Sequence, residues 1–456
     1  MSMPQPADLL IEPRWLLPIA PANTVLGQQA VAVGGGRILA VGPAAELRAR
    51  FAPREQALRG RHALLPGLVN AHTRACHALL RGLPVRGPRL RWLAETVTPL
   101  ERRAVSADFV RDGTRLAVAA MLRAGITCYA DLSPLPDEAA RAAAALQMRA
   151  LIGLPVTDAP SAWAEDATAH LAKAEGLWDE YRSDPRIGLY FAPLPAQGVS
   201  DATLARLRRV ADELDARIAV HLAELPPSTA GPSRAWPEEA PGNAVQDSAP
   251  RLRLAPGPQA LTLERLLALG LLRPGFSAIG ALGCEAQDLE LLMHHGACVI
   301  GCPQAELRLG ASPRPLLGLA SPRAALGTDS PAAAGALDLL AEARTAALLS
   351  DLPAEGALRL ATLGGATALG LAAQIGSIEP GKAADLICID LGALADTPAA
   401  QVAAAIVFGA TRGEVSDVWA SGRVAVSGGR LLAFDPAELE ALPREWAQRL
   451  ALEAAA

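Results

Sequence analysis

The chain has 456 residues, of which 51% are hydrophobic and 20% are charged, and its formal net charge is -5. This length suffices for one large domain and a smaller second one, and the composition is typical of a soluble globular protein. The charge balance excludes a basic surface for nucleic acid or an anionic membrane, and Gly, Pro, Arg or Asp interrupts every apolar run before the ~18 residues that a membrane span requires.

The N-terminal segment predicts β-structure without a targeting signal. Asp8 and Glu12 lie early, and no basic leader precedes an apolar core, so we expect a mature, cytoplasmic protein. Two β-like pieces, Gln29 to Val33 and Arg37 to Val41, are joined by a run of three glycines. This arrangement predicts a hairpin within residues 8 to 61.

From about residue 64 to residue 345, short apolar runs alternate with amphipathic segments. The predicted strands are Leu64–His72, Ile126–Leu132, Arg149–Val156, Ile187–Pro193, Ile218–Glu224, Ala278–Leu282, Cys298–Pro303 and Ala324–Ser330. The predicted helices between them include Ala107–Arg123, Asp137–Met148, Ala164–Tyr181, Asp201–Leu214 and Ala286–His295. Repeated strand and helix predict parallel βαβ units, so the fold class is α/β, a (β/α)8 barrel whose βα junctions open toward one face.

The C-terminal part returns to β-like sequence. The segment from Ile375 to Leu391 is followed by Glu414 to Ala420 and Arg423 to Val426 around a Ser-Gly turn. We expect the β-rich pieces at the two ends to pair into one composite sandwich. The predicted domains are therefore residues 1–63 with 371–456, and a barrel over residues 64–370.

Residues 225–258 break the alternation. Their many prolines forbid a regular helix or strand over most of the segment. Because the segment follows a predicted barrel strand, it is a candidate lid, and an exposed insertion is an equal alternative.

The motifs along the chain carry a family resemblance. The end of the first predicted strand, LLPGLVNAHTRACHALLRGL, resembles the opening motif of the amidohydrolase superfamily, and its LLRG is typical of the aminohydrolase branch. Further matches follow in order: GITCYADL, VHLAE, LGTDS, LDLLAEARTAALL and GSIEPGKAADL. The branch contains methylthioadenosine and S-adenosylhomocysteine deaminases and the TRZ/ATZ chlorohydrolases, so the resemblance implies a barrel hydrolase for C–N or C–Cl bonds of small heterocycles.

The resemblance also implies a metal site holding zinc or iron. His72 matches the first histidine of the HxH motif, His221 the histidine after strand 5, and Asp329 the aspartate after strand 8. Glu224 matches the glutamate that transfers protons in the family. These four residues are the predicted metal ligands and catalytic residue.

Among the positions that depart from the family pattern, three bear directly on metal binding and proton transfer. Arg74 stands at the second histidine of HxH, Gly280 at the histidine after strand 6, and Leu194 at a further conserved-motif histidine. A guanidinium cannot donate a lone pair, and glycine and leucine cannot transfer protons, a role that contributes roughly 100-fold per group. The departures predict weak or no deaminase activity, with the divalent metal absent or weakly bound.

Arg74 is predicted to substitute for the charge of the metal. Asp329 and Glu224 would otherwise be buried carboxylates without a counter-ion, which is costly. Since a guanidinium matches a carboxylate bidentately, we expect Arg74 to donate to one of them at or beside the metal position. For His72 and His221 the alternative is that each is only a structural histidine at the end of an apolar strand.

Three functional hypotheses remain open. The chain is a catalytically silent homologue that binds a small heterocycle or a partner, or an active hydrolase with His72, His221 and Asp329 as a reduced ligand set. The third possibility is a structural partner of an active paralogue, and a homo-oligomer is expected otherwise. Metal analysis separates the first two hypotheses, and co-purification with a paralogue tests the third.

Overall fold

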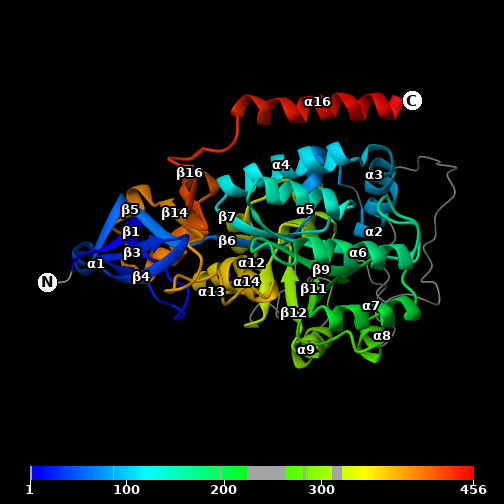
Figure 1. The fold of residues 1–456 in the computed structure, drawn as a ribbon, viewed down its shortest axis with the longest axis horizontal. Coiled ribbons are helices and arrows are strands. Elements are labelled where there is room, and N and C mark those ends of the chain that lie inside the picture. Colours follow the sequence, from blue (N-terminus) through cyan, green and yellow to red (C-terminus); the bar gives the residue numbers. More distant parts are fainter. Residues whose placement is uncertain are drawn as a thin grey trace, which may run out of the picture.

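The fold is a parallel barrel beside a β-sheet built from both ends of the chain (Figure 1). The computed structural model describes residues 3–85, 87–194, 198–222, 262–280, 284, 286–310 and 321–455. The Pro-rich segment at residues 225–258 and Glu224 lie outside these residues, so the lid hypothesis stays a prediction.

Eight parallel strands form the barrel in chain order, each hydrogen-bonded to the next. They are β6 (Leu68–Thr73), β7 (Ile126–Asp131), β8 (Arg149–Val156), β9 (Ile187–Pro193), β10 (Arg217–His221), β11 (Phe276–Ile279), β12 (Cys298–Gly301) and β13 (Ala324–Leu326). A bridge between Thr73 and Asp329 brings the last strand back to the first. The predicted (β/α)8 class is thereby confirmed, because this bridge nearly closes the sheet on itself.

Helices connect successive barrel strands. The main ones are α4 (Ala107–Arg123), α5 (Pro136–Ala145), α6 (Ala167–Tyr181), α7 (Asp201–Glu213), α8 (Leu263–Ala268), α9 (Ala286–His294) and α12 (Leu339–Ser350). Several start where the sequence supplies an N-cap: the side chains of Ser106, Asp166 and Ser200 accept hydrogen bonds from the first-turn N–H groups of α4, α6 and α7. These caps explain why the predicted and observed starts agree within a few residues.

Shorter helices line the loops and the C-terminal region. They are α1 (Ala44–Arg50), α2 (Arg89–Trp92), α3 (Thr98–Ala104), α10 (Pro303–Arg308), α11 (Pro331–Ala334), α13 (Ala354–Arg359), α14 (Gly365–Ala368) and α15 (Val402–Ala404). A final helix, α16 (Pro436–Ala455), lies outside the barrel on the side of α4 (Figure 1), and its Trp446 contacts Phe109 edge-on and donates to Asp112. Among the described residues, no helix has the length and apolar character needed to cross a membrane.

The second sheet joins the two ends of the chain, as predicted. Its strands are β1 (Gln5–Leu16), β2 (Leu26–Gly27), β3 (Gln29–Gly34), β4 (Arg37–Pro43), β5 (Phe51–Pro66), β14 (Leu386–Asp390), β15 (Val415–Ala420), β16 (Arg423–Ser427) and β17 (Arg430–Leu431). The pairing of β5 with β14 unites the two halves, with Leu65 opposite Ile387. Alternate side chains of this sheet enter separate apolar clusters, one around Leu64 and Leu386 and another around Leu10 and Phe51. The exact domain bounds at residues 63/64 and 370/371 stay a prediction.

The first predicted barrel strand is divided between two strands of the structure, and the last one, predicted to extend to Ser330, ends at Leu326. The run Leu64–His72 is split at Gly67, where β5 of the terminal sheet ends and β6 of the barrel begins. Gly67 donates its N–H to Asp385, and a Cβ at this glycine would lie 2.1 Å from Thr127 Oγ1. The continuous apolar pattern hid the change of sheet because the last four residues of β5 and all of β6 are buried.

Candidate functional site

Three predicted ligands converge at the carboxyl ends of the barrel strands. His72 is the residue before the last one of β6, His221 ends β10, and Asp329 follows β13. One donor atom from each lies within 4.8 Å of the others, and all three residues are buried. The Nε2 atoms of His72 and His221 are each 3.7 Å from an Asp329 carboxylate oxygen. Their convergence is confirmed, and their role as ligands stays a prediction.

The chain fixes Asp329 through its backbone as well as its side chain. Asp329 has a φ of 52°, an uncommon value for a residue with a Cβ, and its N–H donates to the carbonyl of His72. Its Oδ1 accepts from the N–H of Ser330 at 2.7 Å, and its carbonyl accepts from Thr73 Oγ1 at 2.9 Å. The strained backbone is therefore held by bonds to β6, which aim the carboxylate at the histidines.

The buried side-chain amide of Asn70 joins β6 to the residue that precedes Asp329. Asn70 donates to Thr328 Oγ1 at 2.8 Å and accepts from the N–H of Thr328 at 3.0 Å. These two bonds link β6 to the residue before Asp329 and use the amide in both directions. The site thus rests on a fixed connection between the first and last strands of the barrel.

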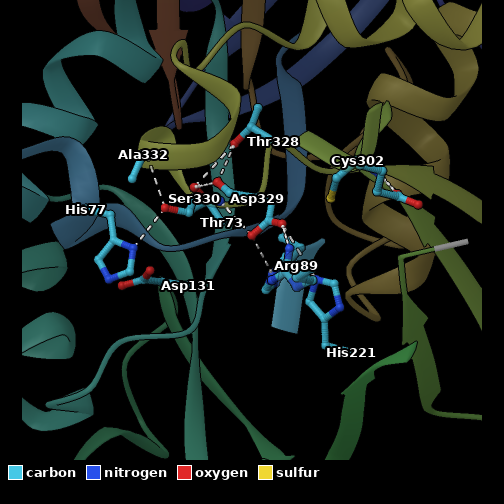
Figure 2. A network of polar contacts seen from close by, with 12 residues as sticks. Thr73, His77, Arg89, Asp131, His221, Cys302, Thr328, Asp329, Ser330 and Ala332 are labelled. Carbon is cyan, nitrogen blue, oxygen red and sulfur yellow. Dashed lines mark hydrogen bonds and ion pairs between the residues drawn. The ribbon is translucent and has the colours of Figure 1, made fainter. Parts of the chain in front are cut away.

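A residue that sequence reasoning missed dominates the charge of the site. Arg89, the first residue of α2, donates from Nη1 to Asp329 Oδ2, and both side chains are buried. Figure 2 shows Asp329 between Arg89 and Ser330, with His221 beyond Arg89. Burial alone would raise the pKa of Asp329, but Arg89 and the two histidines outweigh it and hold that pKa well below its usual range. Asp329 is therefore an ionised carboxylate in a buried ion pair.

The expected partner of Asp329 was Arg74, so this part of the prediction is corrected. Among the described residues, the guanidinium that donates to Asp329 belongs to Arg89. Arg74 directly follows β6 and precedes a short 3₁₀ helix, Ala75–Leu80. Its charge partly opposes the rise that burial causes in the pKa of Asp131, and it adds to the lowering of the pKa of Glu101 by His77. The alternative pairing of Arg74 with Glu224 lies outside the described residues.

His72, one of the two predicted ligand histidines, differs from an ordinary surface histidine. Burial lowers the pKa of His72, and the nearby guanidinium groups of Arg74 and Arg89 act in the same direction. Neither ring nitrogen of His72 has a hydrogen-bond partner among the described residues. A neutral, buried imidazole without a partner is suited to ligating a cation.

The fit to a divalent metal is incomplete. The three donors have a number and spacing that suit a catalytic zinc site. The charge does not suit it, because the Arg89 guanidinium occupies one oxygen of the carboxylate. Two unit charges about 4 Å apart interact by about 4 kcal/mol at an effective dielectric of 20, so a divalent ion beside this guanidinium is strongly disfavoured. In the arrangement described, the residues do not fit the metal.

A second group of hydrogen-bonded side chains, made up of His77, Ser330 and Glu101, adjoins this site. Nδ1 of His77 lies 2.8 Å from Ser330 Oγ, and its Nε2 lies 2.8 Å from Glu101 Oε1. Burial would raise the pKa of Glu101, but its hydrogen bond to His77 leaves that pKa below its usual value. The sequence singled out neither Glu101 nor a role for His77, since both lie off the family motif. These hydrogen bonds hold Ser330 in place, and the N–H of Ser330 donates to Asp329 and orients its carboxylate.

Gly280 and Leu194, which stand where the family pattern has histidines, each directly follow a barrel strand. Gly280 follows β11 with a φ of 89°, a region that favours glycine. Leu194 follows β9, and its N–H donates to the carbonyl of Val156 at 3.0 Å. A proton-transferring side chain is absent at both positions, as the sequence indicated.

Asp131, at the end of β7, provides a pH-dependent prediction. The carboxyl is buried, and burial raises its pKa from 3.8 to about 7 although the Ala75 N–H and the Arg74 charge oppose the shift. Since the folded pKa exceeds the unfolded one, the folded chain holds this proton more tightly, and stability falls as the pH rises from about 4 to about 7.

Asp131→Asn removes this titration and keeps the acceptor for Ala75. The stability of the variant relative to the parent chain is therefore expected to rise with pH, by up to about 4 kcal/mol at 1.36 kcal/mol per pKa unit. Urea unfolding at pH 4.5, 6 and 8 measures the difference. A difference that does not change with pH would show that Asp131 does not titrate in this range.

The fold and the site together define a class of protein. A nearly closed parallel barrel, with two histidines and an aspartate converging at the carboxyl ends of its strands, presents a metal-type donor set at the face where barrel enzymes carry their active sites. Comparison with known sequences gives the family: the Amidohydrolase family profile matches residues 63–425, and a bacterial imidazolonepropionase-like composite domain matches residues 30–52. The chain belongs to the amidohydrolase family.

Individual relatives narrow the resemblance. The chain is 33% identical over 453 residues to the 5-methylthioadenosine/S-adenosylhomocysteine deaminase of Teredinibacter turnerae, covering 97% of this chain and 98% of the relative. A crystal structure of an adenosine deaminase from Xanthomonas campestris with bound zinc is 38% identical, with a TM-score of 0.88 and coverage of 99% and 100%. Atrazine chlorohydrolase from Arthrobacter aurescens, at 20% identity and a TM-score of 0.79 over 96% of this chain and 99% of that one, supports the fold alone.

Proposed function

We propose that this chain is an amidohydrolase-family protein that binds a small nitrogen heterocycle at the barrel mouth without efficient metal-dependent deamination. The observation that carries the proposal is the buried ion pair between Arg89 and Asp329. In this account the guanidinium takes the electrostatic place of a divalent ion, as the sequence suggested for Arg74. The named activities of the relatives, on adenosine and 5-methylthioadenosine, make purine nucleosides the first compounds to test as ligands.

The ionised carboxylate of Asp329 supports the proposal that the Arg89 guanidinium stands in the place of a metal ion. Asp329 is ionised, and its pKa is held down by Arg89 together with the two histidines. Breaking a buried pair by removing one partner costs about 3–5 kcal/mol, so the carboxylate keeps the guanidinium unless another cation replaces it. A metal ion that uses Asp329 as a ligand therefore has to share the carboxylate with Arg89 or displace it.

The proton-transfer groups give independent support. Deamination of a heterocycle needs water activation and protonation of the leaving nitrogen, and each positioned acid or base contributes about 10²–10⁴-fold. Gly280 and Leu194 have no group for either step. Glu224, the predicted proton-transferring residue, lies outside the described residues. Among the residues that the structure describes, Ser330, His77 and Glu101 form a hydrogen-bonded series that positions Asp329. The role proposed for these residues is orientation of the site.

Metal content and ammonia release of the purified chain test the proposal together. Chain expressed with ample zinc is expected to contain well under one zinc per molecule, and adenosine or 5′-methylthioadenosine is expected to release no ammonia above the background rate. Calorimetry with the same nucleosides measures binding directly. About one zinc per chain with zinc-dependent ammonia release, lost on chelation, would contradict the proposal.

The second candidate is an active metal-dependent hydrolase with a reduced ligand set. It is favoured by the three donor atoms within 4.8 Å and by the two ring nitrogens of His72 that have no hydrogen-bond partner among the described residues. In this candidate Arg89 leaves Asp329, and His72, His221 and Asp329 hold the ion, which would supply an activated water. The zinc measurement above separates the two candidates, because only the active hydrolase predicts stoichiometric metal.

A further inference from the structure

The opposite end of the barrel contains a cavity with an excess of arginines. It has a volume of about 650 Å³ and lies where β8, β9 and β10 begin, away from Asp329 and the histidines. Five arginines and two aspartates line it, together with Trp178 and Tyr181. The volume falls within the range of about 300–1,000 Å³ that is usual for small-molecule sites.

Three of the five arginines already lie beside aspartates of the same chain. Arg149 is buried and donates to Asp385, to the Pro185 carbonyl and to Ser421. Nε of Arg186 lies 3.9 Å from Oδ1 of Asp184, and Nη1 of Arg182 lies 3.6 Å from Oδ1 of Asp179. Their charges are therefore compensated within the chain.

Arg217 and Arg37 are not compensated in this way. Arg217 Nη1 donates to the carbonyl of Ala368 at 3.2 Å, and Arg37 Nη1 donates to the carbonyl of Gly381 at 2.8 Å. Neither guanidinium has a carboxylate within 4.0 Å among the residues the structure describes. Burial lowers the pKa of Arg217, although Cys298 and Asp215 oppose the shift. Arg217 is half-buried and Arg37 is exposed, so an anion in this cavity would offset part of the desolvation of Arg217 and could also reach Arg37.

The chain also makes room for the Arg217 guanidinium. Gly370 has a φ of 75°, and a Cβ at this position would lie 2.3 Å from Nε and Nη2 of Arg217. Arg217 is the first residue of β10, whose other end carries His221. The guanidinium is thus placed by a barrel strand on one side and a glycine turn on the other, which favours a defined position for its donors.

We propose that this cavity binds a small organic anion, with its phosphate or carboxylate group held by Arg217 and Arg37 and an attached ring lying against Trp178 and Tyr181. A planar guanidinium matches either group through paired N–H donors. Aromatic side chains provide faces for a flat ring. This site goes beyond the proposed function, because it lies at the opposite end of the barrel from the family site and uses none of its residues.

Titration calorimetry at low salt tests the site with four probes: adenosine 5′-monophosphate, nicotinate, inorganic phosphate and neutral adenosine. At least one of the two ring-bearing anions is expected to bind, more tightly than inorganic phosphate. Arg217→Gln and Arg37→Gln are each expected to weaken that binding about tenfold. Arg209→Gln, an exposed arginine of α7 that does not line the cavity, is the matched control and is expected to leave the affinity unchanged.

Several results would overturn the proposal. These are no binding of either ring-bearing anion, binding no tighter than inorganic phosphate, or affinities equal in the parent chain and both variants. Thermal melts verify that Arg217→Gln is folded, and Arg37→Gln, at an exposed position, provides the second test. Adenosine binding at the barrel mouth and zinc content are expected to be the same in both variants, so failure here is distinguishable from failure of the proposed function.

Discussion

Replacing Arg89 with methionine is expected to convert the barrel mouth into a zinc site, raising the zinc content from well below one to about one ion per chain. Methionine preserves much of the side-chain length and removes the cation from Asp329 Oδ2. The freed carboxylate then joins His72 and His221, whose donor atoms already lie within 4.8 Å of it. Elemental analysis of protein purified with and without added zinc measures the change.

The same substitution is expected to reduce stability when zinc is withheld. It leaves Asp329 buried without a counter-ion, at a cost of about 3–5 kcal/mol in the free energy of unfolding. Zinc should restore that loss in proportion to the logarithm of its concentration above the dissociation constant. Unfolding in chelator and in excess zinc separates the two states.

Arg91→Met is a matched control for these measurements. Arg91 lies in the same short helix, but its ion pair with Glu95 is exposed. Exposed pairs contribute about 0–1 kcal/mol, so this variant should change neither zinc content nor stability appreciably. If Arg89→Met behaves like Arg91→Met, the pair with Asp329 does not control the site.

Restoring the HxH motif is expected to matter only when Arg89 is also removed. Arg74→His supplies the second histidine of the motif, yet Asp329 remains paired with Arg89, so zinc content should stay low in the single variant. In Arg74→His with Arg89→Met, four protein ligands are available, and zinc should bind about tenfold more tightly than in Arg89→Met alone, a gain of about 1.4 kcal/mol. Competition with a metal indicator of known affinity measures this difference.

The double variant is expected to bind zinc without gaining deaminase activity. Gly280 still lacks the imidazole that the family carries, and its φ of 89° makes a histidine there strained. Stoichiometric zinc in Arg74→His alone would show that Asp329 is available while Arg89 is present. That result would favour the active-hydrolase candidate.

Local sequence pattern predicted most of the fold. The bounds of β8, β9 and α4 agree with the predicted runs Arg149–Val156, Ile187–Pro193 and Ala107–Arg123. These elements have continuous apolar runs or a helical period, and α4 has a clear N-cap. The terminal strands were harder to predict, because β1 and β5 mix charged and apolar residues and depend on partners far along the chain.

The candidate site was predictable only in part. Motif order placed His72, His221 and Asp329, since each ends or follows a barrel strand and all such ends meet at one face. Arg89 had no comparable signal. It lies in a loop segment with several other arginines, and nothing in the local sequence distinguishes the one that turns inward.

The sequence by itself determined the family, the alternation of strands and helices, and the loss of histidines at positions 74, 194 and 280, because these are properties of residue type and order. Only the tertiary structure decided which cation neutralises Asp329. Arg89 and Asp329 are 240 residues apart, and their contact exists because the loop after the first strand folds over the end of the last. An ion pair depends on distance and burial in three dimensions, and neither has a periodic trace along the chain.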